Sequence, residues 1–162
     1  MKKRKKTEKH LNNTVRRYGG DILQSHNFQQ SKNYIQHGKQ SVFHHSMDVA
    51  KTSLKLSRML PFKFKESEIV RGALLHDYFL YDWHNKEFPL RKPSDFFGLH
   101  GFTHANTALK NAKRDFDLSE NEKEIIRKHM WPLNPKPPMS REAWIVTMAD
   151  KICSLRETVH RR

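Results

Sequence analysis

The chain has 162 residues and a formal net charge of +14 at neutral pH, with 36% hydrophobic and 30% charged residues. This length suits one domain with a single core. No apolar run approaches the roughly 20 residues that cross a bilayer, and a lone cysteine excludes a framework of intramolecular disulfides. We therefore expect a soluble, cytoplasmic protein without a membrane partner. The positive charge favours an anionic partner, either nucleic acid or a small phosphorylated substrate.

Residues 1–40 form a basic and polar segment ahead of the apolar part of the chain. Six of the first nine residues are Lys or Arg, and no apolar stretch follows them that would make a secretory signal. We expect a partly ordered arm whose start is solvated, with a short helix between Tyr18 and Tyr34. Nucleic acid could bind through this arm. Residues 41–162 are then the globular domain.

Helices are predicted from residue 41 onward, because apolar residues recur there every three or four positions. The first predicted helix runs from Val42 to Leu60 and ends before Pro61. The second begins near Glu66 and continues to Leu80.

The remainder of the chain is predicted as one long loop and three further helices. The aromatic and basic segment Tyr81–Gly101 is broken by prolines and glycines, so we predict a long functional loop there. The third helix is predicted over Thr103–Phe116. The segment Ser119–Glu122 has the Ser-x-x-Glu form of a capping box and starts a fourth helix through His129, and the fifth helix follows Ser140. No strand-like alternation of any length appears, so the sequence predicts an all-α fold, a compact multi-helix bundle.

Histidine is unusually frequent, with 11 in one small domain. Several histidines and two aspartates fall on the apolar faces or at the ends of the predicted helices. A single inward histidine is usually a hydrogen-bonded core residue, but burying unpartnered ionisable groups costs on the order of several kcal/mol each. Six such groups are explained together if they converge on a divalent metal between the helices. The candidate ligands are His45, His76, Asp77, His104, His129 and Asp150.

Three segments resemble the motifs of the HD-domain superfamily of metal-dependent phosphohydrolases. His45–Ala50 resembles the opening His-x-x-x-Val-Ala motif, Ala73–Asp77 the His-Asp pair behind its apolar helix, and Ala149–Lys151 the closing Ala-Asp-Lys. The resemblance covers about residues 41–157. It implies an all-α HD-domain bundle with a metal site between its helices. It also implies hydrolysis of a phosphate ester by metal-activated water, with a nucleotide-like substrate favoured.

Two further histidines bear on the number of metal ions. His104 and His129 resemble the middle motif and the fourth histidine of those members that hold two ions. In that arrangement Asp77 bridges, these two histidines hold the second ion, and the other candidate ligands hold the first. The resemblance implies a divalent transition metal, one or two ions of Fe, Mn, Co, Ni or Zn, with Mg also compatible. His76 and Asp77 are then the catalytic residues, and Asp77 orients the nucleophilic water.

Substrate phosphate needs cations outside the metal ligands. Arg91, Lys92 and Lys151 are the candidates, although a chain this basic has a cation near most features. The cyclic-dinucleotide phosphodiesterases of the superfamily carry a lysine three residues after the aspartate of the His-Asp pair, and a Gly-Tyr-Pro motif. The corresponding residue here is Leu80, and Gly-Tyr-Pro is absent. We therefore do not expect that activity.

Two other functions are compatible with the sequence. The di-iron oxygenases of the same superfamily share the order His, His-Asp, His, His, Asp. An inactive, metal-stabilised module that binds nucleic acid through its basic arm would also fit the charge. The sequence leaves the substrate, the native metal and the oligomeric state open.

Overall fold

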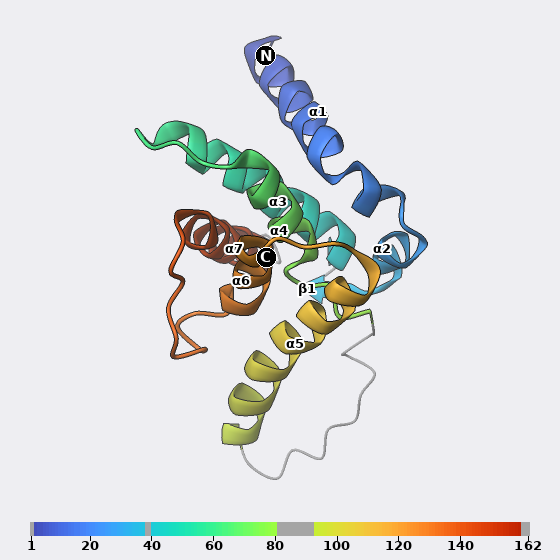
Figure 1. Ribbon diagram of the computed structural model, residues 1–162, viewed down its shortest axis with the longest axis vertical. Coiled ribbons are helices and arrows are strands. Elements are labelled where there is room, and N and C mark those ends of the chain that lie inside the picture. The colour runs from blue at the N-terminus through green and yellow to red at the C-terminus, as the bar shows by residue number, and fades with distance from the viewer. Residues whose placement is uncertain (1, 38–39, 81–92, 160–162) are drawn as a thin grey trace.

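The computed structural model describes residues 2–37, 40–80 and 93–159 (Figure 1). Its elements in chain order are α1 (Lys2–Gln24), α2 (His26–Gln30), the 3-10 helix η1 (Ser31–Asn33), β1 (Ile35–His37), β2 (Gln40–Ser41), α3 (Val42–Met59), α4 (Glu66–Leu75), α5 (Pro93–Asp115), α6 (Glu120–Lys128) and α7 (Arg141–Val159). The two short strands pair antiparallel. The predicted all-α class is confirmed. Within the described residues, no helix is long and apolar enough to cross a membrane.

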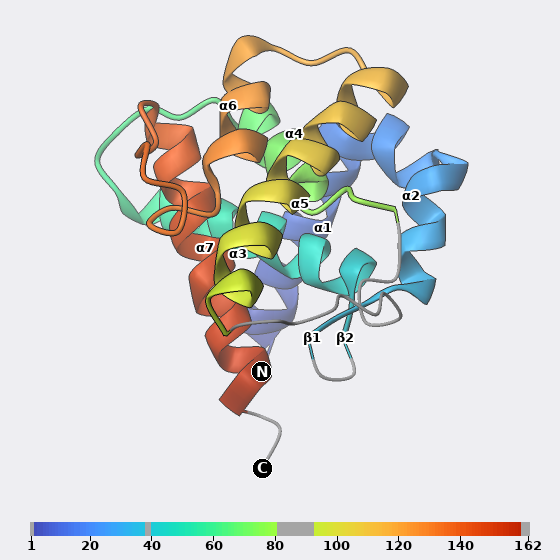
Figure 2. The same cartoon turned by 90° about the horizontal axis from the view of Figure 1, so that it is seen from below.

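Helix α4 lies at the centre of the molecule and contacts α1, α3, α5, α6 and α7. Figure 2 shows these helices gathered around it. Its residues 69–75 are all buried except Arg71, because a helix covered on several sides needs apolar residues on more than one face. The apolar run that precedes the His-Asp pair is therefore the middle of the core.

Helices α4 and α6 approach closely at Gly72. A Cβ atom at this position would lie 2.7 Å from both Cδ1 and Cγ2 of the buried residue Ile125, well inside the roughly 3.5–4.0 Å of an ordinary carbon–carbon contact. His76 and His129 follow these two residues by four positions, about one helical turn. The missing side chain thus lets the ends of the two helices, each followed by a histidine, lie side by side.

Helix α4 ends earlier than predicted, at Leu75 instead of Leu80. His76 is its C-cap, and Nδ1 of His76 donates to the Ala73 carbonyl oxygen at 2.7 Å. Leu80 has a φ of 54°, a left-handed conformation that does not continue a regular helix. The chain therefore turns away immediately after Asp77.

Asp115, the last residue of α5, fixes the segment that follows this turn. Its Oδ2 accepts hydrogen bonds from the Tyr78 hydroxyl at 2.8 Å and from Nδ2 of Asn27 at 2.9 Å. Nδ2 of Asn111, one turn earlier in α5, donates to the Tyr78 carbonyl oxygen at 3.0 Å. The hydrogen bond from Arg114 holds the pKa of the Asp115 carboxyl well below its usual range. Tyr78, the residue after the His-Asp pair, is thus hydrogen-bonded to α5 directly and linked to α2 through Asp115.

The predicted starts of α6 and α7 agree with the structure. Ser119 and Glu122 form the predicted capping box. The Ser140 hydroxyl accepts a hydrogen bond from the Ala143 amide at 3.1 Å. The prediction of a loop is wrong for residues 93–101, because α5 begins at Pro93, and proline is favoured at the first position of a helix. Residues 81–92 lie outside the described residues.

The basic N-terminal segment is more ordered than a solvated arm. It forms α1, with a kink at Gly19, and Leu11, Val15 and Ile22 are buried in the same core as α4. These three residues lie at intervals of four and seven, so they share one face of the helix. This sparse apolar face packs α1 against the core that α4 also lines.

Candidate metal centre

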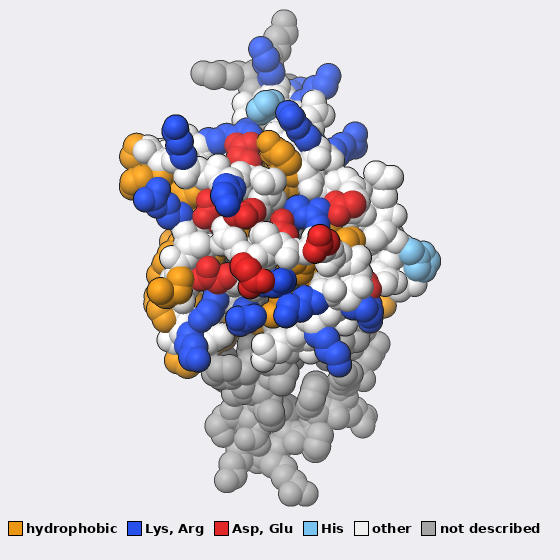
Figure 3. Space-filling view, viewed as in Figure 1, with side chains coloured by type: hydrophobic (Ala, Val, Ile, Leu, Met, Phe, Trp, Pro, Cys, Tyr) orange, Lys and Arg blue, Asp and Glu red, His pale blue; other side chains and the backbone are white. Residues whose placement is uncertain are grey.

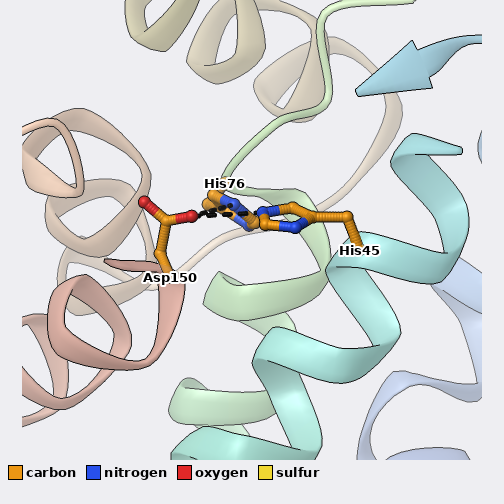
Figure 4. Close-up of side chains that lie close together, drawn as sticks. All are labelled: His45, His76 and Asp150. Atoms are coloured by element: carbon orange, nitrogen blue, oxygen red, sulfur yellow. Dashed lines mark hydrogen bonds and ion pairs between the residues drawn. The ribbon is translucent and has the colours of Figure 1, made fainter. Parts of the chain in front are cut away.

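Two groups of buried histidines and aspartates meet between the helices. Within each group the ligand atoms lie within 4.8 Å of one another, and the groups are His45, His76 and Asp150, and Asp77, His104 and His129. Figure 4 shows the first group, with His45 on α3 and His76 after α4 pointing toward Asp150 on α7. The structure thus brings together all six residues that the sequence analysis proposed as metal ligands.

Asp77 lies between the two groups and faces both. Its Oδ2 is 3.2 Å from Nε2 of His76 and 3.8 Å from Nε2 of His45. Its Oδ1 is 3.1 Å from Nε2 of His104 and 3.4 Å from Nε2 of His129. One carboxylate oxygen therefore points to each group, so Asp77 could serve both.

The ends of α4 and α6 present their histidines in the same way. Nδ1 of His76 donates to the carbonyl oxygen of Ala73, and Nδ1 of His129 donates to that of Ile126 at 2.8 Å. Because Nδ1 donates to a carbonyl oxygen, Nε2 is the ring atom directed into the centre, and its lone pair would be available to a metal ion once the ring is neutral. The ring centroids are 4.9 Å apart. Both rings also lie at helix C-termini, whose partial negative charge favours a cation.

Glu157 orients His45, and it is not among the residues predicted from the sequence. Nδ1 of His45 donates to the Glu157 carboxylate, at 2.9 Å from Oε1 and 3.1 Å from Oε2. Nε2 of His45 then faces Oδ1 of Asp150 at 3.1 Å. The signal was present in the sequence, because a spacing of seven residues places Glu157 on the same face of α7 as Asp150, about two turns later.

The protein groups hold both aspartates of the centre ionised. Burial raises the pKa of Asp77 and of Asp150, but the neighbouring histidines hold both pKa values well below the usual range of a carboxyl. Burial lowers the pKa of His45, yet its hydrogen bonds to Asp150 and Glu157 outweigh this and raise the pKa to about 9. The two carboxylates thus attract positive charge into a buried site.

The arrangement of acceptor atoms fits a bound cation. Nε2 of His76 is buried and has no hydrogen-bond partner among the described residues, although Oδ2 of Asp77 is its near neighbour. Nε2 of His104 and Nε2 of His129 face each other at 3.1 Å. Lone pairs that face one another repel unless a proton or a metal ion lies between them. Imidazole and carboxylate donors suit divalent transition metals such as Fe, Mn, Co, Ni and Zn.

Of the three cations proposed for substrate phosphate, Lys151 lies in the described residues. Its side chain is 42% exposed, and its Nζ lies 3.7 Å from Oδ2 of Asp150. The same Nζ donates to the His129 carbonyl oxygen at 3.3 Å. Lys151 therefore lies at the edge of the centre, where it is accessible to a ligand. Arg91 and Lys92 lie outside the described residues.

The fold and the site together define an all-helical protein with a buried histidine–aspartate metal centre. A family model described as HD domain matches residues 42–155, and the chain belongs to the HD-domain family. The match confirms the resemblance seen in the sequence motifs, and it spans all six candidate ligands, from His45 to Asp150. HD domains bind divalent metals, and most of the superfamily are metal-dependent hydrolases. Comparisons with curated proteins and with solved structures found no match.

Proposed function

We propose that this chain is a metal-dependent phosphohydrolase that cleaves a small phosphate ester, with a nucleotide-like substrate favoured. The observation that carries the proposal is the position of Asp77, one oxygen of which faces each of two buried ligand groups. Divalent ions held in this way would lower the pKa of a bound water and neutralise the oxygens of a phosphoryl group. This chemistry suits hydrolysis of phosphate esters.

Each group of the centre has a defined part in this proposal. His45, His76 and Asp150 would hold one ion, and His104 and His129 would hold the other. Asp77 would serve both ligand groups, and its carboxylate would orient the attacking water by accepting a hydrogen bond from it. The low pKa of Asp77 keeps the carboxylate ionised for this purpose, and its burial restricts access of bulk water.

Lys151 supplies positive charge for the substrate phosphate in this proposal. Its ammonium group is exposed beside a carboxylate of the centre, so it can reach a phosphate that approaches the ions from solvent. Arg91 and Lys92 are proposed for the same role on the basis of the sequence alone.

The test is to measure metal content and hydrolysis on the same samples. Purified protein is reloaded with Mn, Fe, Co, Ni or Zn, analysed by mass spectrometry for bound metal, and screened with phosphomonoesters and phosphodiesters. The variant Asp77→Asn keeps the size of the side chain but removes the bridging charge, so we expect loss of metal and of hydrolysis. Asp117→Asn makes the same change at an exposed aspartate and serves as the matched control.

The outcomes separate this proposal from the other functions. Metal in wild type and in Asp117→Asn, lost in Asp77→Asn together with hydrolysis, supports a phosphohydrolase. Oxygen consumption with Fe(II) and no hydrolysis of any ester would favour an oxygenase instead. Bound metal with neither activity would favour an inactive, metal-stabilised binding module. Absence of metal from every reloaded sample would overturn the proposal.

A further inference from the structure

Helix α1 carries a basic face on its exposed side. At 100° per residue, Lys5, Lys6, Lys9, Arg16 and Arg17 fall within an arc of about 120°, and all five side chains are exposed. Figure 1 shows the N-terminal half of α1 projecting from the bundle at the end opposite α5. Figure 3 shows Lys and Arg side chains gathered around this projecting end. The face is about 18 Å long, at 1.5 Å per residue.

The charges of this basic face are not neutralised within the protein. None of the five side chains forms an ion pair with an acidic residue in the described part of the chain. Glu8 lies on a different side of α1, where it contacts Lys51 at 3.2 Å and Lys55 at 3.7 Å. Like charges this close together repel, so their grouping lowers stability unless an anion binds to them.

The apolar side of α1 indicates what kind of anion can bind. Leu11, Val15 and Ile22 are at most 1% exposed, because they are packed into the core. A helix that binds a membrane surface inserts its apolar face among the lipid chains, and this face is not available. A partner that presents only phosphates, regularly spaced along a rod or strand, needs no apolar contact.

We infer that the basic face of α1 is a docking surface for the phosphate backbone of nucleic acid. Its length matches about five phosphates of one strand at 3.4 Å per nucleotide. Five of the six exposed side chains in this arc between residues 5 and 17 are Lys or Arg, and the sixth is Asn13. We therefore expect the affinity to come from charge, with little dependence on sequence. None of the five basic residues belongs to the metal centre, so this binding holds the protein on nucleic acid without delivering a substrate.

The experiment measures binding of the full chain to labelled probes by fluorescence anisotropy over a series of salt concentrations. The probes are single-stranded RNA, a DNA duplex of the same length, and vesicles with one part phosphatidylserine to three parts phosphatidylcholine. The test variant reverses three charges of the face, Lys5→Glu, Lys9→Glu and Arg16→Glu. The control reverses three exposed lysines elsewhere, Lys63→Glu, Lys110→Glu and Lys136→Glu. Both variants change the net charge equally.

We expect wild type to bind a nucleic-acid probe with a log–log salt slope of about −3 to −4, as for about four neutralised phosphates. The test variant should lose at least about tenfold in affinity at low salt, and the control should stay within about threefold of wild type. Equal loss in both variants, tighter binding to vesicles than to nucleic acid, or a salt-independent affinity would each overturn the inference. A neutral set, Lys5→Gln, Lys9→Gln and Arg16→Gln, repeats the test should the reversed set unfold.

This inference does not depend on the proposed hydrolase function. Hydrolysis of a small ester and metal content should be the same in the test variant as in wild type, because no residue of the basic face lies in the centre. Failure of the docking surface would therefore leave activity intact, and failure of the activity would leave salt-dependent binding intact.

Discussion

Replacing Gly72 by alanine tests how closely α4 and α6 must pack to form the centre. The new Cβ would lie 2.7 Å from Cδ1 and Cγ2 of Ile125 and 2.9 Å from its Cβ. The third distance is decisive, because the Cβ of Ile125 is fixed to the backbone and no change of rotamer can move it away. The helices must therefore separate by roughly 1 Å to reach an ordinary contact.

The expected loss of stability is about 2 kcal/mol. Alanine favours a helix over glycine by about 1 kcal/mol, whereas forcing extra atoms into a packed core costs about 1–3 kcal/mol, and an overlap with three atoms is at the upper end or beyond. The same separation moves His76 away from His129, whose ring centroids are 4.9 Å apart. Metal ligands tolerate errors of about 0.2 Å, so we also expect metal affinity to fall by about tenfold or more.

Urea unfolding followed by circular dichroism measures the first effect, and a loss of 2 kcal/mol lowers the midpoint by about 1 M. The control is Gly20→Ala, because its Cβ would meet only Nε2 of Gln24 at 3.8 Å. We expect this control to be stabilised by about 0.5–1 kcal/mol. A Gly72→Ala protein as stable as wild type, with unchanged metal affinity, would refute this account of the helix contact.

Three further changes have defined outcomes. Glu157→Gln should weaken metal binding by about tenfold to 100-fold. The urea midpoint of unfolding of the metal-free protein should stay within about 0.5 M of wild type. An unchanged metal affinity would show that Glu157 does not orient His45. Asp115→Asn should cost about 1–3 kcal/mol near pH 7. The pKa of Asp115 is lower in the folded protein than in the unfolded chain, where it is about 3.9. The ionised carboxyl therefore contributes to the free energy of unfolding above that pH, and this contribution fades as the pH falls below it. The deficit of Asp115→Asn relative to wild type should therefore shrink in acid, and a deficit that grows there would contradict the charge argument. Lys151→Ala should raise KM for a phosphate ester by about tenfold with metal content unchanged; loss of metal instead would place Lys151 in the centre's structure.

The helices with clear terminal signals were predictable from the sequence. Proline after the apolar pattern placed the end of α3, and the Ser-x-x-Glu pattern placed the start of α6. The end of α4 was not predictable, since the apolar pattern continues past His76 while the backbone turns there. The order of α1 was not predictable either. A few apolar residues among many charges dock a helix only when a core is present to receive them.

The six candidate ligands were found from the sequence because each breaks the expectation for its position, being ionisable within an apolar pattern. Glu157 gave a weaker signal, because a glutamate near the end of a helix is ordinary unless the partner that it faces is known. Gly72 gave no signal of its role. A glycine in a helix is usually unfavourable, and only the position of Ile125 on another helix shows why it is needed.

The ligands of the centre come from positions far apart in the sequence, so metal binding is linked to the cooperativity of folding. His45 and Asp150 are separated by 105 positions, and their side chains meet only when α3 and α7 are both in place. Closing so long a loop has a large entropic cost, which an ion bound only by the complete site would offset by mass action. Opening of any one of the five helices that contribute ligands would release the ion. The centre thus joins helices that could otherwise open separately into a single unit that opens as a whole.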